Sequence, residues 1–516
     1  MPHGYIKRIL NAQVYDVAQE TPLEPAARLS ERLGNRVLFK REDLQPVFSF
    51  KCRGAYNKLF QLCRSGEPPA GVIASSAGNH AQGVALAARR LGLKALIIMP
   101  KTTPSIKVDA VKALGAEPIL YGDAYDDAYQ HAVTLAEREG LTFVHPFDDP
   151  DVIAGQGTVA QELLHQHSGA LDAVFIPVGG GGLMAGMSAY IKYLRPEIKV
   201  IGVEPVDAPS LHHALRAGER VRLDSVGLFA DGVAVRQVGE ENWRIMRETV
   251  DDVVLVEVDE ICAAIKDVFD DTRSIAEPAG ALSVAGLKRY VETTGARHQT
   301  LAAMICGANM NFDRLRHVSE RAELGEQREM LLAVTIPEQP GSFRTFCEAV
   351  GRRGVTEFNY RYADDREAHI FVGIKLESRA ERRDIIARLK QHGYPVHDMT
   401  DNEMAKLHIR HMVGGYGSGI PRETIYRFEF PERPGALLDF LNAMDLRWNI
   451  SLFHYRNHGA AYGRVLAGFQ VPDEHAERFR TFLEGLNYPY WDETGNIAYA
   501  LFLGSHSDNY AVAGQD

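Results

Sequence analysis

The chain is long, mildly acidic and of ordinary composition. It has 516 residues, a formal net charge of −11, 45% apolar residues and 24% charged residues. This length exceeds what one hydrophobic core accommodates, so we expect about two to four domains. The composition excludes long disordered or fibrous regions, and the absence of a Lys/Arg block in the sequence argues against a nucleic-acid partner.

Cysteine usage and the N-terminal segment point to a reducing compartment. The cysteines form no CxxC pair, which disfavours both a disulfide framework and a structural zinc site; they are Cys52, Cys63, Cys262, Cys306 and Cys347. Residues 1–20 lack a charged start followed by an apolar run, and the sequence has no stretch of about 18 apolar residues. We therefore expect a cytoplasmic protein without a membrane segment.

From about residue 71 to residue 307, short β-branched runs alternate with longer helical patterns. Examples are VIAS followed by GNHAQGVALAARRLG, and DAVFIPV followed by GLMAGMSAYIKYL. This rhythm is typical of a parallel sheet covered by helices on both faces. It predicts a doubly wound α/β domain over residues 1–312, in which ligands bind beyond the carboxyl ends of the strands.

The pattern changes after residue 312. The charged segment RLRHVSERAELGEQRE suits a solvated connecting helix within residues 313–329. Beyond it, LLAVTIPEQPGSFRTFCEAV returns 94 residues later as IYRFEFPERPGALLDFLNAM. Each copy has a strand, a Pro-x-x-Pro-Gly turn, an amphipathic helix and two further strand-like runs. We expect an α+β region of two ferredoxin-like units, at 330–415 and 416–516; duplication for stability alone is the alternative.

The segment SFKCRGA places Lys51 beside Phe48 and Phe50. A solvated lysine is the simplest interpretation of this residue alone. A lysine in an apolar pocket, however, has a destabilised ammonium form, and its neutral amine can attack an aldehyde to form a Schiff base.

A second segment stands where a predicted strand gives way to a helix. Hydroxyl and backbone N–H groups at a helix N-terminus bind anions, here a substrate carboxylate; an N-cap with a tight turn is the alternative. Asn79 could donate a hydrogen bond to a phenolic oxygen of a cofactor. The candidate carboxylate-binding residues are Ser75, Ser76, Ala77, Gly78 and His80.

A run of glycines also follows a predicted strand and precedes a helix. Such a run is costly in chain entropy and is useful where the backbone must approach a phosphate closely; it comprises Gly179, Gly180, Gly181 and Gly182, followed by Leu183. The loop lacks the fingerprints of dinucleotide and ATP sites. At the end of the strand LAAMI, Cys306 is most simply a small apolar residue.

In combination, these motifs resemble the family of biosynthetic threonine dehydratases, also called threonine ammonia-lyases, of the tryptophan-synthase-β-like pyridoxal phosphate fold. The resemblance covers essentially the whole chain, through SFKCRGAYNK, ASSAGNHAQGVA, PVGGGGL, GLFADGVAV, EPAGAL, GANMNF, TEFNYR and NISLFHYR. It implies a fold type II catalytic domain of two α/β subdomains, followed by a regulatory domain of two ACT-like repeats. The implied reaction converts L-threonine to 2-oxobutanoate and ammonia, the first committed step of isoleucine biosynthesis, with L-serine as a secondary substrate.

The resemblance also implies roles for individual residues. Lys51 would bind pyridoxal 5'-phosphate covalently and act as the catalytic base, beside Phe50. Asn79 would contact the 3'-oxygen of the cofactor, Gly179 to Leu183 would cradle its phosphate, and Cys306 would face its pyridine nitrogen.

For the tail, the resemblance implies inhibition by isoleucine, antagonism by valine and a homotetramer. The implied effector residues are Glu357, Phe358, Asn359, Tyr360, Arg361 and Tyr362, together with Ser451, Leu452, Phe453, His454 and Tyr455.

The sequence differs from its relatives at Cys306, and from the related serine racemases at Ala77 and Ser210. Cys306 stands where serine is common, and a thiol is a weaker hydrogen-bond donor, so the cofactor ring would be a modest electron sink that favours prompt loss of the β-hydroxyl. Ala77 replaces the serine that acts as a second base in related serine racemases, which disfavours racemisation. Glu204 matches the first ligand of the metal site in those racemases, but Ser210 stands where the next acid is expected, so we predict no metal.

Two alternatives to a regulated threonine dehydratase stay open. One is another β-eliminating pyridoxal phosphate enzyme, such as a serine dehydratase, which a substrate panel would distinguish. The other is a catalytically inactive amino-acid sensor, against which the intact Lys51, Asn79 and glycine loop argue.

Overall fold

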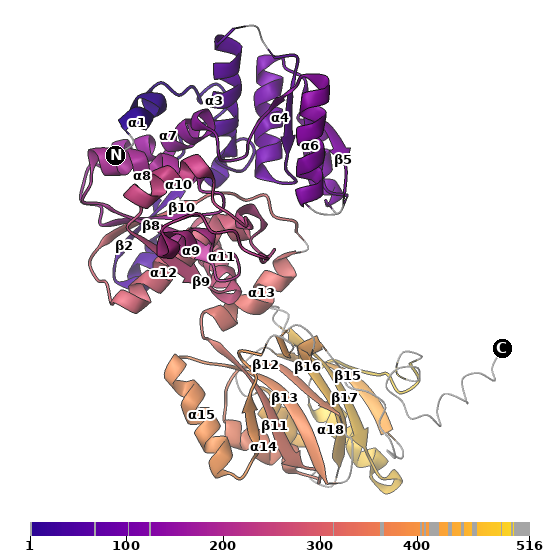
Figure 1. Ribbon diagram of the computed structural model, residues 1–516. Helices are drawn as coiled ribbons and strands as arrows, with labels where there is room; N and C mark the ends of the chain where they lie inside the picture. Colours follow the sequence, from indigo (N-terminus) through magenta and orange to yellow (C-terminus); the bar gives the residue numbers. More distant parts are fainter. Residues whose placement is uncertain are drawn as a thin grey trace, which may run out of the picture. The chain divides into compact units, whose positions relative to one another are not determined.

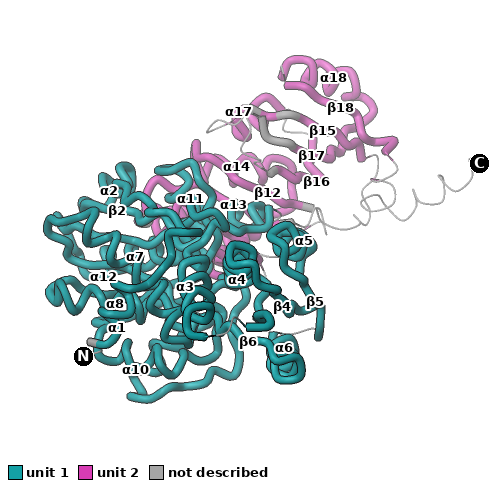
Figure 2. The backbone as a smooth tube through the Cα atoms, turned by 90° about the horizontal axis from the view of Figure 1, so that it is seen from above, with its two compact units in different colours: residues 1–325 teal, residues 326–516 magenta. Residues whose placement is uncertain are grey.

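The computed structural model divides into two compact units, residues 1–325 and residues 326–516 (Figure 2). The described residues are 3–66, 69–101, 103–122, 125–312, 314–361, 366–402, 405–406, 409–411, 423–431, 436–444, 448–456, 462–486, 488–496 and 499. Among them, no helix is both long enough and apolar enough to cross a membrane.

The first unit is built on two sheets, and the larger one has the strand order β1-β2-β10-β7-β8-β9. Only β1 is antiparallel to its neighbour. Most of its strands are continuous apolar runs, as expected for a parallel sheet buried on both faces. The strands are β1 (Leu23–Pro25), β2 (Arg36–Arg41), β7 (Ala173–Pro177), β8 (Lys199–Pro205), β9 (Asp252–Val256) and β10 (Thr300–Ile305).

Helices cover both faces of this larger sheet (Figure 1). One face packs against α1 (His3–Leu10), α7 (Pro150–Gln166), α8 (Gly182–Leu194), α9 (Ser210–Ala217) and α10 (Glu240–Thr249). The other face packs against α2 (Ala27–Leu33), α11 (Val258–Thr272), α12 (Pro278–Thr294) and α13 (Arg314–Gly325). Short 3-10 helices, η1 (Glu42–Leu44) and η2 (Asp231–Val233), complete this part.

The smaller sheet is wholly parallel, with the order β5-β4-β3-β6. Helices α3, α4 and α5 cover one face and α6 covers the other (Figure 1). The predicted doubly wound architecture is therefore confirmed, in two subdomains. The elements are α3 (Lys51–Arg64), β3 (Val72–Ser75), α4 (Asn79–Leu91), β4 (Ala95–Met99), α5 (Ser105–Ala113), β5 (Glu117–Leu120), α6 (Tyr125–Glu139) and β6 (Thr142–Phe143).

The helix expected to be a solvated connector belongs to the core of the first unit. Val318 and Ala322 of α13 are buried in the cluster that α11 and α12 form on the larger sheet. The many charges of this segment obscure two small apolar residues at i, i+4 spacing, which form a narrow buried stripe. The following strand begins at Glu329, within the range expected for the connector.

The second unit is a single antiparallel sheet of eight strands, ordered β14-β11-β13-β12-β16-β17-β15-β18. The first repeat supplies β11 (Glu329–Pro337), α14 (Ser342–Val350), β12 (Val355–Arg361), β13 (Glu367–Lys375), α15 (Arg379–Gln391), β14 (Val396–Asp398) and η3 (Ile409–His411). The second supplies β15 (Glu423–Pro431), α17 (Ala436–Ala443), β16 (Asn449–Arg456), β17 (Tyr462–Gln470), η4 (Asp473–His475), α18 (Ala476–Gly485) and β18 (Tyr490–Asp492).

The two repeats follow the predicted ferredoxin-like pattern, and β12 pairs with β16 to join them into one sheet. Helices α14, α15, α17 and α18 pack on the same face of the sheet, over one aromatic core. Phe358 and Phe453 meet in that core with ring centres 5.7 Å apart. Such aromatic contacts stabilise the junction beyond the area they bury.

A buried network of four charges ties the first unit together beside the start of α3. The guanidinium of Arg53 donates to both carboxylate oxygens of Glu42 on η1 and of Glu162 on α7. Lys40 of β2 donates to Glu162 at 2.6 Å. All four side chains are fully buried. Such a network adds little net stability over apolar packing, but the loss of one member leaves uncompensated buried charge.

Substitution of Arg53 tests this network. Arg53→Met should destabilise the protein by about 3–5 kcal/mol, because two buried carboxylates would share only the charge of Lys40. The matched control is Arg138→Met, which removes an exposed ion pair and should cost about 1 kcal/mol or less. Urea unfolding followed by circular dichroism measures both, and equal midpoints for the two variants would contradict the analysis.

Candidate active site

Lys51 is the first residue of α3, and its side chain is partly buried. The amine donates a hydrogen bond to the carbonyl oxygen of Pro146 at 2.9 Å and lies 5.4 Å from the centre of the Phe50 ring. Gly83 of α4 packs directly on this turn, since a Cβ there would lie 3.0 Å from the carbonyl carbon of Lys51. Burial lowers the pKa of Lys51 to about 8, although Cys306 and Glu277 oppose the shift.

The loop before Lys51 has an unusual backbone. Phe48 adopts the left-handed conformation, with φ of 54°, and its side chain is exposed. Its carbonyl accepts from the N–H of Ala308, and Ser49 forms an isolated bridge with Gly307. These contacts hold Lys51 beside the carboxyl end of β10, where ligands bind in such folds. A strained residue next to a candidate site is a common feature of functional loops.

The glycine loop follows β7 and leads into α8. A Cβ at Gly180 would lie 2.3 Å from the Phe147 ring, and Gly181 has a φ of 96° that side chains rarely adopt. The carbonyl of Gly180 accepts from the side chain of Asn242 at 2.8 Å and from the N–H of Gly239 at 3.0 Å. Within the described chain, no N–H group from Gly179 to Leu183 donates a hydrogen bond. These N–H groups are therefore available to an anion.

The segment from Ser75 to His80 joins β3 to α4. The hydroxyl of Ser75 is buried and has no partner among the described residues. The hydroxyl of Ser76 accepts from the N–H of Gly78 at 3.2 Å. The His80 ring bonds to the carbonyl of Val144 at 3.0 Å, and burial lowers its pKa to about 3. His80 is therefore neutral. A carboxylate bound by this segment would meet hydroxyl and backbone N–H groups but no cation.

Asn79 begins α4 and contacts two residues that sequence reasoning missed. Its side-chain N–H donates to Glu277 at 2.6 Å, and its oxygen accepts from Asn309 at 2.7 Å. Glu277 lies in EPAGAL and Asn309 in GANMNF, two of the segments that carry the family resemblance. The sequence predicted no role for either residue. Burial is the main cause that raises the pKa of Glu277 to about 7.

Cys306 ends β10 and is buried. Its carbonyl accepts from the N–H of Phe50 at 3.4 Å, which brings it beside the Lys51 loop. Burial, with nearby Glu42 and Glu277, raises the pKa of its thiol well above the usual range. Residue 306 therefore presents a neutral group.

Glu204 has a structural role in this chain. Its carboxylate accepts from the N–H groups of Leu211 and His212, at 2.7 and 2.9 Å, and from the hydroxyl of Ser210 at 3.2 Å. It thus satisfies free donors at the start of α9. Across the described residues, no group of three or more His, Cys, Asp or Glu side chains is arranged to hold a metal ion.

The two predicted effector segments lie side by side at the junction of the repeats. In the β12–β16 pair, Phe358 stands opposite Tyr455 and Tyr360 opposite Phe453. These four rings are in the core that faces the helices. Side chains alternate along a strand, so Glu357, Asn359 and Leu452 are buried on the opposite face, and His454 on that face is partly buried. Ser451 is buried at an irregularity of β16 where the pairing register shifts. Arg361 ends β12, and Tyr362 lies outside the described residues.

Comparison with known families agrees with this division of the chain. Residues 14–307 match the family described as pyridoxal-phosphate dependent enzyme. Residues 320–409 and 414–503 each match the C-terminal regulatory domain of threonine dehydratase.

Individual relatives extend the match to nearly the full length. The chain is 59% identical to a biosynthetic L-threonine dehydratase of Burkholderia multivorans, over 97% of this chain and 99% of the relative. It is 55% identical to the Escherichia coli counterpart, over 97% and 98% of the two chains. A solved structure of the processed form of threonine deaminase isoform 2 from Solanum lycopersicum is 51% identical, with a TM-score of 0.61, over 62% of this chain and 88% of that one.

The fold, the lysine and glycine-loop segments and these matches lead to one conclusion: the chain belongs to the pyridoxal-phosphate dependent enzyme family, and it carries two copies of the regulatory domain of threonine dehydratases.

Proposed function

We propose that this chain dehydrates and deaminates L-threonine to 2-oxobutanoate and ammonia, with L-serine as a secondary substrate. The observation that carries the proposal is the buried amine of Lys51, which has a lowered pKa and lies beside the carboxyl ends of the strands. The biosynthetic threonine dehydratases that match the chain over nearly its full length support the choice of substrate.

The residues of the site suit pyridoxal phosphate. The free N–H groups of the glycine loop match a phosphate, and side chains at Gly179 or Gly180 would collide with Val233 or Phe147. One N–H of Asn79 has no partner among the described residues and suits a phenolic oxygen. A neutral thiol at residue 306 suits an unprotonated pyridine nitrogen. We therefore assign the phosphate to Gly179–Leu183, the 3'-oxygen to Asn79 and the ring nitrogen to Cys306, with Phe50 beside Lys51.

Lys51 is the proposed catalytic base. When bound, pyridoxal phosphate supplies a carbonyl carbon for an amine and a ring that withdraws electrons from the substrate Cα. With a pKa of about 8, roughly a tenth of the Lys51 amine is neutral at pH 7, far more than for a solvated lysine. The neutral amine can bind the cofactor carbonyl carbon and, once displaced by substrate, accept the Cα proton.

Residues from Ser75 to His80 are the proposed binding site of the substrate carboxylate. The buried hydroxyl of Ser75 and the first N–H groups of α4 supply donors without a cation. Ala77 has no group that could act as a second base on the opposite face of the substrate. We expect elimination rather than racemisation.

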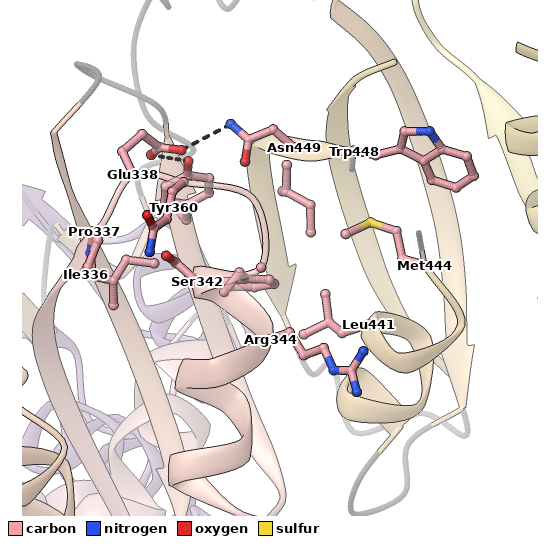
Figure 3. Close-up of a pocket in the computed structure, with 14 residues that line it drawn as sticks. Ile336, Pro337, Glu338, Ser342, Arg344, Tyr360, Leu441, Met444, Trp448 and Asn449 are labelled. Atoms are coloured by element: carbon pink, nitrogen blue, oxygen red, sulfur yellow. Dashed lines mark hydrogen bonds between the residues drawn. The ribbon is translucent and has the colours of Figure 1, made fainter. Parts of the chain in front are cut away.

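A pocket in the second unit supports the proposal of an amino-acid effector. It lies between the β11–α14 turn of the first repeat and α17 with β16 of the second. Glu338 accepts hydrogen bonds from the hydroxyl of Tyr360 and the amide of Asn449, and the three side chains meet at one rim of the pocket (Figure 3). Apolar side chains line the rest, namely Ile336, Phe343, Leu441, Met444, Trp448 and Ile450.

This lining matches a branched-chain amino acid. The carboxylate of Glu338 suits an ammonium group, and the apolar wall suits an aliphatic side chain. Arg344 donates through Nε to Glu348 at 3.1 Å, and its remaining N–H groups suit a carboxylate. We propose isoleucine as the inhibitor and valine as its antagonist, with Tyr360 as the member of the predicted effector segments that lines the pocket. The tetrameric state and the cytoplasmic location that the sequence predicts are part of the same proposal.

Replacement of Lys51 tests the catalytic assignment. Lys51→Ala should lower the rate of 2-oxobutanoate and ammonia release from threonine by at least about a thousandfold, since the variant lacks both the cofactor linkage and the base. Lys112→Ala, an exposed lysine on α5, is the control and should retain full activity. Substantial turnover by Lys51→Ala would refute the assignment.

The pKa of Lys51 predicts a pH dependence for cofactor capture. Only the neutral amine attacks a carbonyl, and burial lowers the pKa of Lys51 to about 8. The rate at which cofactor-free protein captures pyridoxal phosphate should therefore rise about tenfold per pH unit below pH 8 and level off above it. Stopped-flow absorbance measures this rate. A rise that continues to pH 10 would indicate an ordinary, solvated lysine.

Glu338 and Tyr360 provide a test of the effector pocket. Glu338→Gln and Tyr360→Phe should each raise the isoleucine concentration for half-inhibition by about tenfold, because the first removes the negative charge proposed to face the ammonium group and the second removes the hydroxyl that donates to Glu338. Activity without isoleucine should stay unchanged. The control is Glu477→Gln, which alters the solvated start of α18. Unchanged inhibition in both pocket variants would place the effector elsewhere.

A further inference from the structure

We propose that Glu277 is a positioning residue that, together with Asn309, fixes which side of the Asn79 amide presents an N–H group to the cofactor. The proposal rests on the proposed function, because it concerns how the chain holds pyridoxal phosphate. It assigns roles to two residues for which the sequence motifs predicted none.

Three side chains from distant parts of the chain form one line of hydrogen bonds. Asn309 follows β10, Asn79 begins α4, and Glu277 precedes α12. The amide nitrogen of Asn309 donates to the carbonyl of Val47 at 2.8 Å and to the oxygen of Asn79 at 2.7 Å. The amide nitrogen of Asn79 donates to Glu277 at 2.6 Å.

The Val47 carbonyl at one end and the Glu277 carboxyl group at the other determine how the side-chain amides of Asn309 and Asn79 are oriented. A backbone carbonyl only accepts, so the atom of Asn309 that faces Val47 must be its nitrogen. The second N–H of that nitrogen meets Asn79, so Asn79 must turn its oxygen toward Asn309 and its nitrogen toward Glu277. A flipped Asn79 amide would face Asn309 donor to donor and Glu277 acceptor to acceptor. One N–H of Asn79 remains for the cofactor.

Glu277 is itself held tightly, so it can act as a fixed end of this line. Its backbone N–H donates to the carbonyl of Gly307 at 3.0 Å. A Cβ at Gly307 would lie 2.4 Å from the carboxyl oxygen of Glu277, so the carboxyl group packs directly on that backbone. The carboxyl group is buried and has little freedom to leave Asn79.

The orientation holds in both ionisation states of Glu277. Burial and the charge of Asp231 raise its pKa to about 7, while Lys107 and the hydrogen bonds from Asn79 and Asn309 oppose the rise. A carboxylate accepts at both oxygens, and a protonated carboxyl still accepts at its carbonyl oxygen. An acceptor at position 277, rather than a negative charge, is therefore the requirement.

The test uses the affinity and the absorption maximum of pyridoxal phosphate, measured by titration of each full-length variant. Glu277→Leu removes the acceptor and should weaken cofactor binding by about tenfold, with a shifted maximum. Glu277→Gln keeps an acceptor and should stay within about threefold of the unaltered chain.

Asn309→Asp examines the other end of the line. It replaces the donor by an acceptor that faces the Asn79 oxygen, so acceptors stand at both ends and the orientation of the Asn79 amide is no longer fixed. We expect the same direction of spectral shift as in Glu277→Leu and a similar loss of affinity. This variant leaves Glu277 unchanged. An effect on the cofactor can therefore be attributed to the orientation of Asn79 and not to local damage at residue 277.

Asp267→Leu is the matched control, because it removes a buried acid on α11 that pairs with Arg32 and Lys288. It should lower stability and leave the cofactor spectrum and affinity unchanged. Unaltered affinity and spectrum in folded Glu277→Leu and Asn309→Asp would overturn the positioning role, as would a Glu277→Gln variant as impaired as Glu277→Leu. Failure of the unaltered chain to bind pyridoxal phosphate would instead refute the proposed function.

Discussion

The site depends on the burial of one amine. Lys51 would be an ordinary cation in water, and enclosure between the two subdomains lowers its pKa to about 8. Nearby elements of the first unit support this enclosure. Gly83 lets α4 pack against the turn that carries Lys51, and the Arg53 network fixes the same first turn of α3 to β2, η1 and α7.

Close packing and a low content of charged groups also characterise the rest of the site. Glycine stands where the backbone lies against a ring or a carboxyl group, as at Gly180 beside Phe147 and Gly307 beside Glu277. The polar groups around the site are neutral or close to their pKa near pH 7, as shown by His80, Cys306 and Glu277. The bound cofactor would therefore bring most of the charge into the site, and the chain would respond with aligned donors rather than with cations.

Much of this architecture could be predicted from the sequence, because periodicity reports burial directly. The alternation of apolar strands and longer helices predicted the doubly wound sheets, and the 94-residue repeat predicted two ferredoxin-like units. The sequence did not predict that the two ferredoxin-like repeats share one sheet. The pattern of β12 and β16 does not show that these strands pair with each other. The charged α13 was expected in solvent, and its buried Val318 and Ala322 were missed. Glu277 and Asn309 were missed because their role arises from contacts across about 200 residues of chain.

The most direct test of the account is to locate the covalent attachment point of the cofactor. Borohydride reduction of the full-length protein with bound pyridoxal phosphate, followed by peptide mass spectrometry, identifies the modified residue. We expect a single modified residue, Lys51. Modification of a different lysine, or the absence of any modification in protein that releases ammonia from threonine, would contradict it.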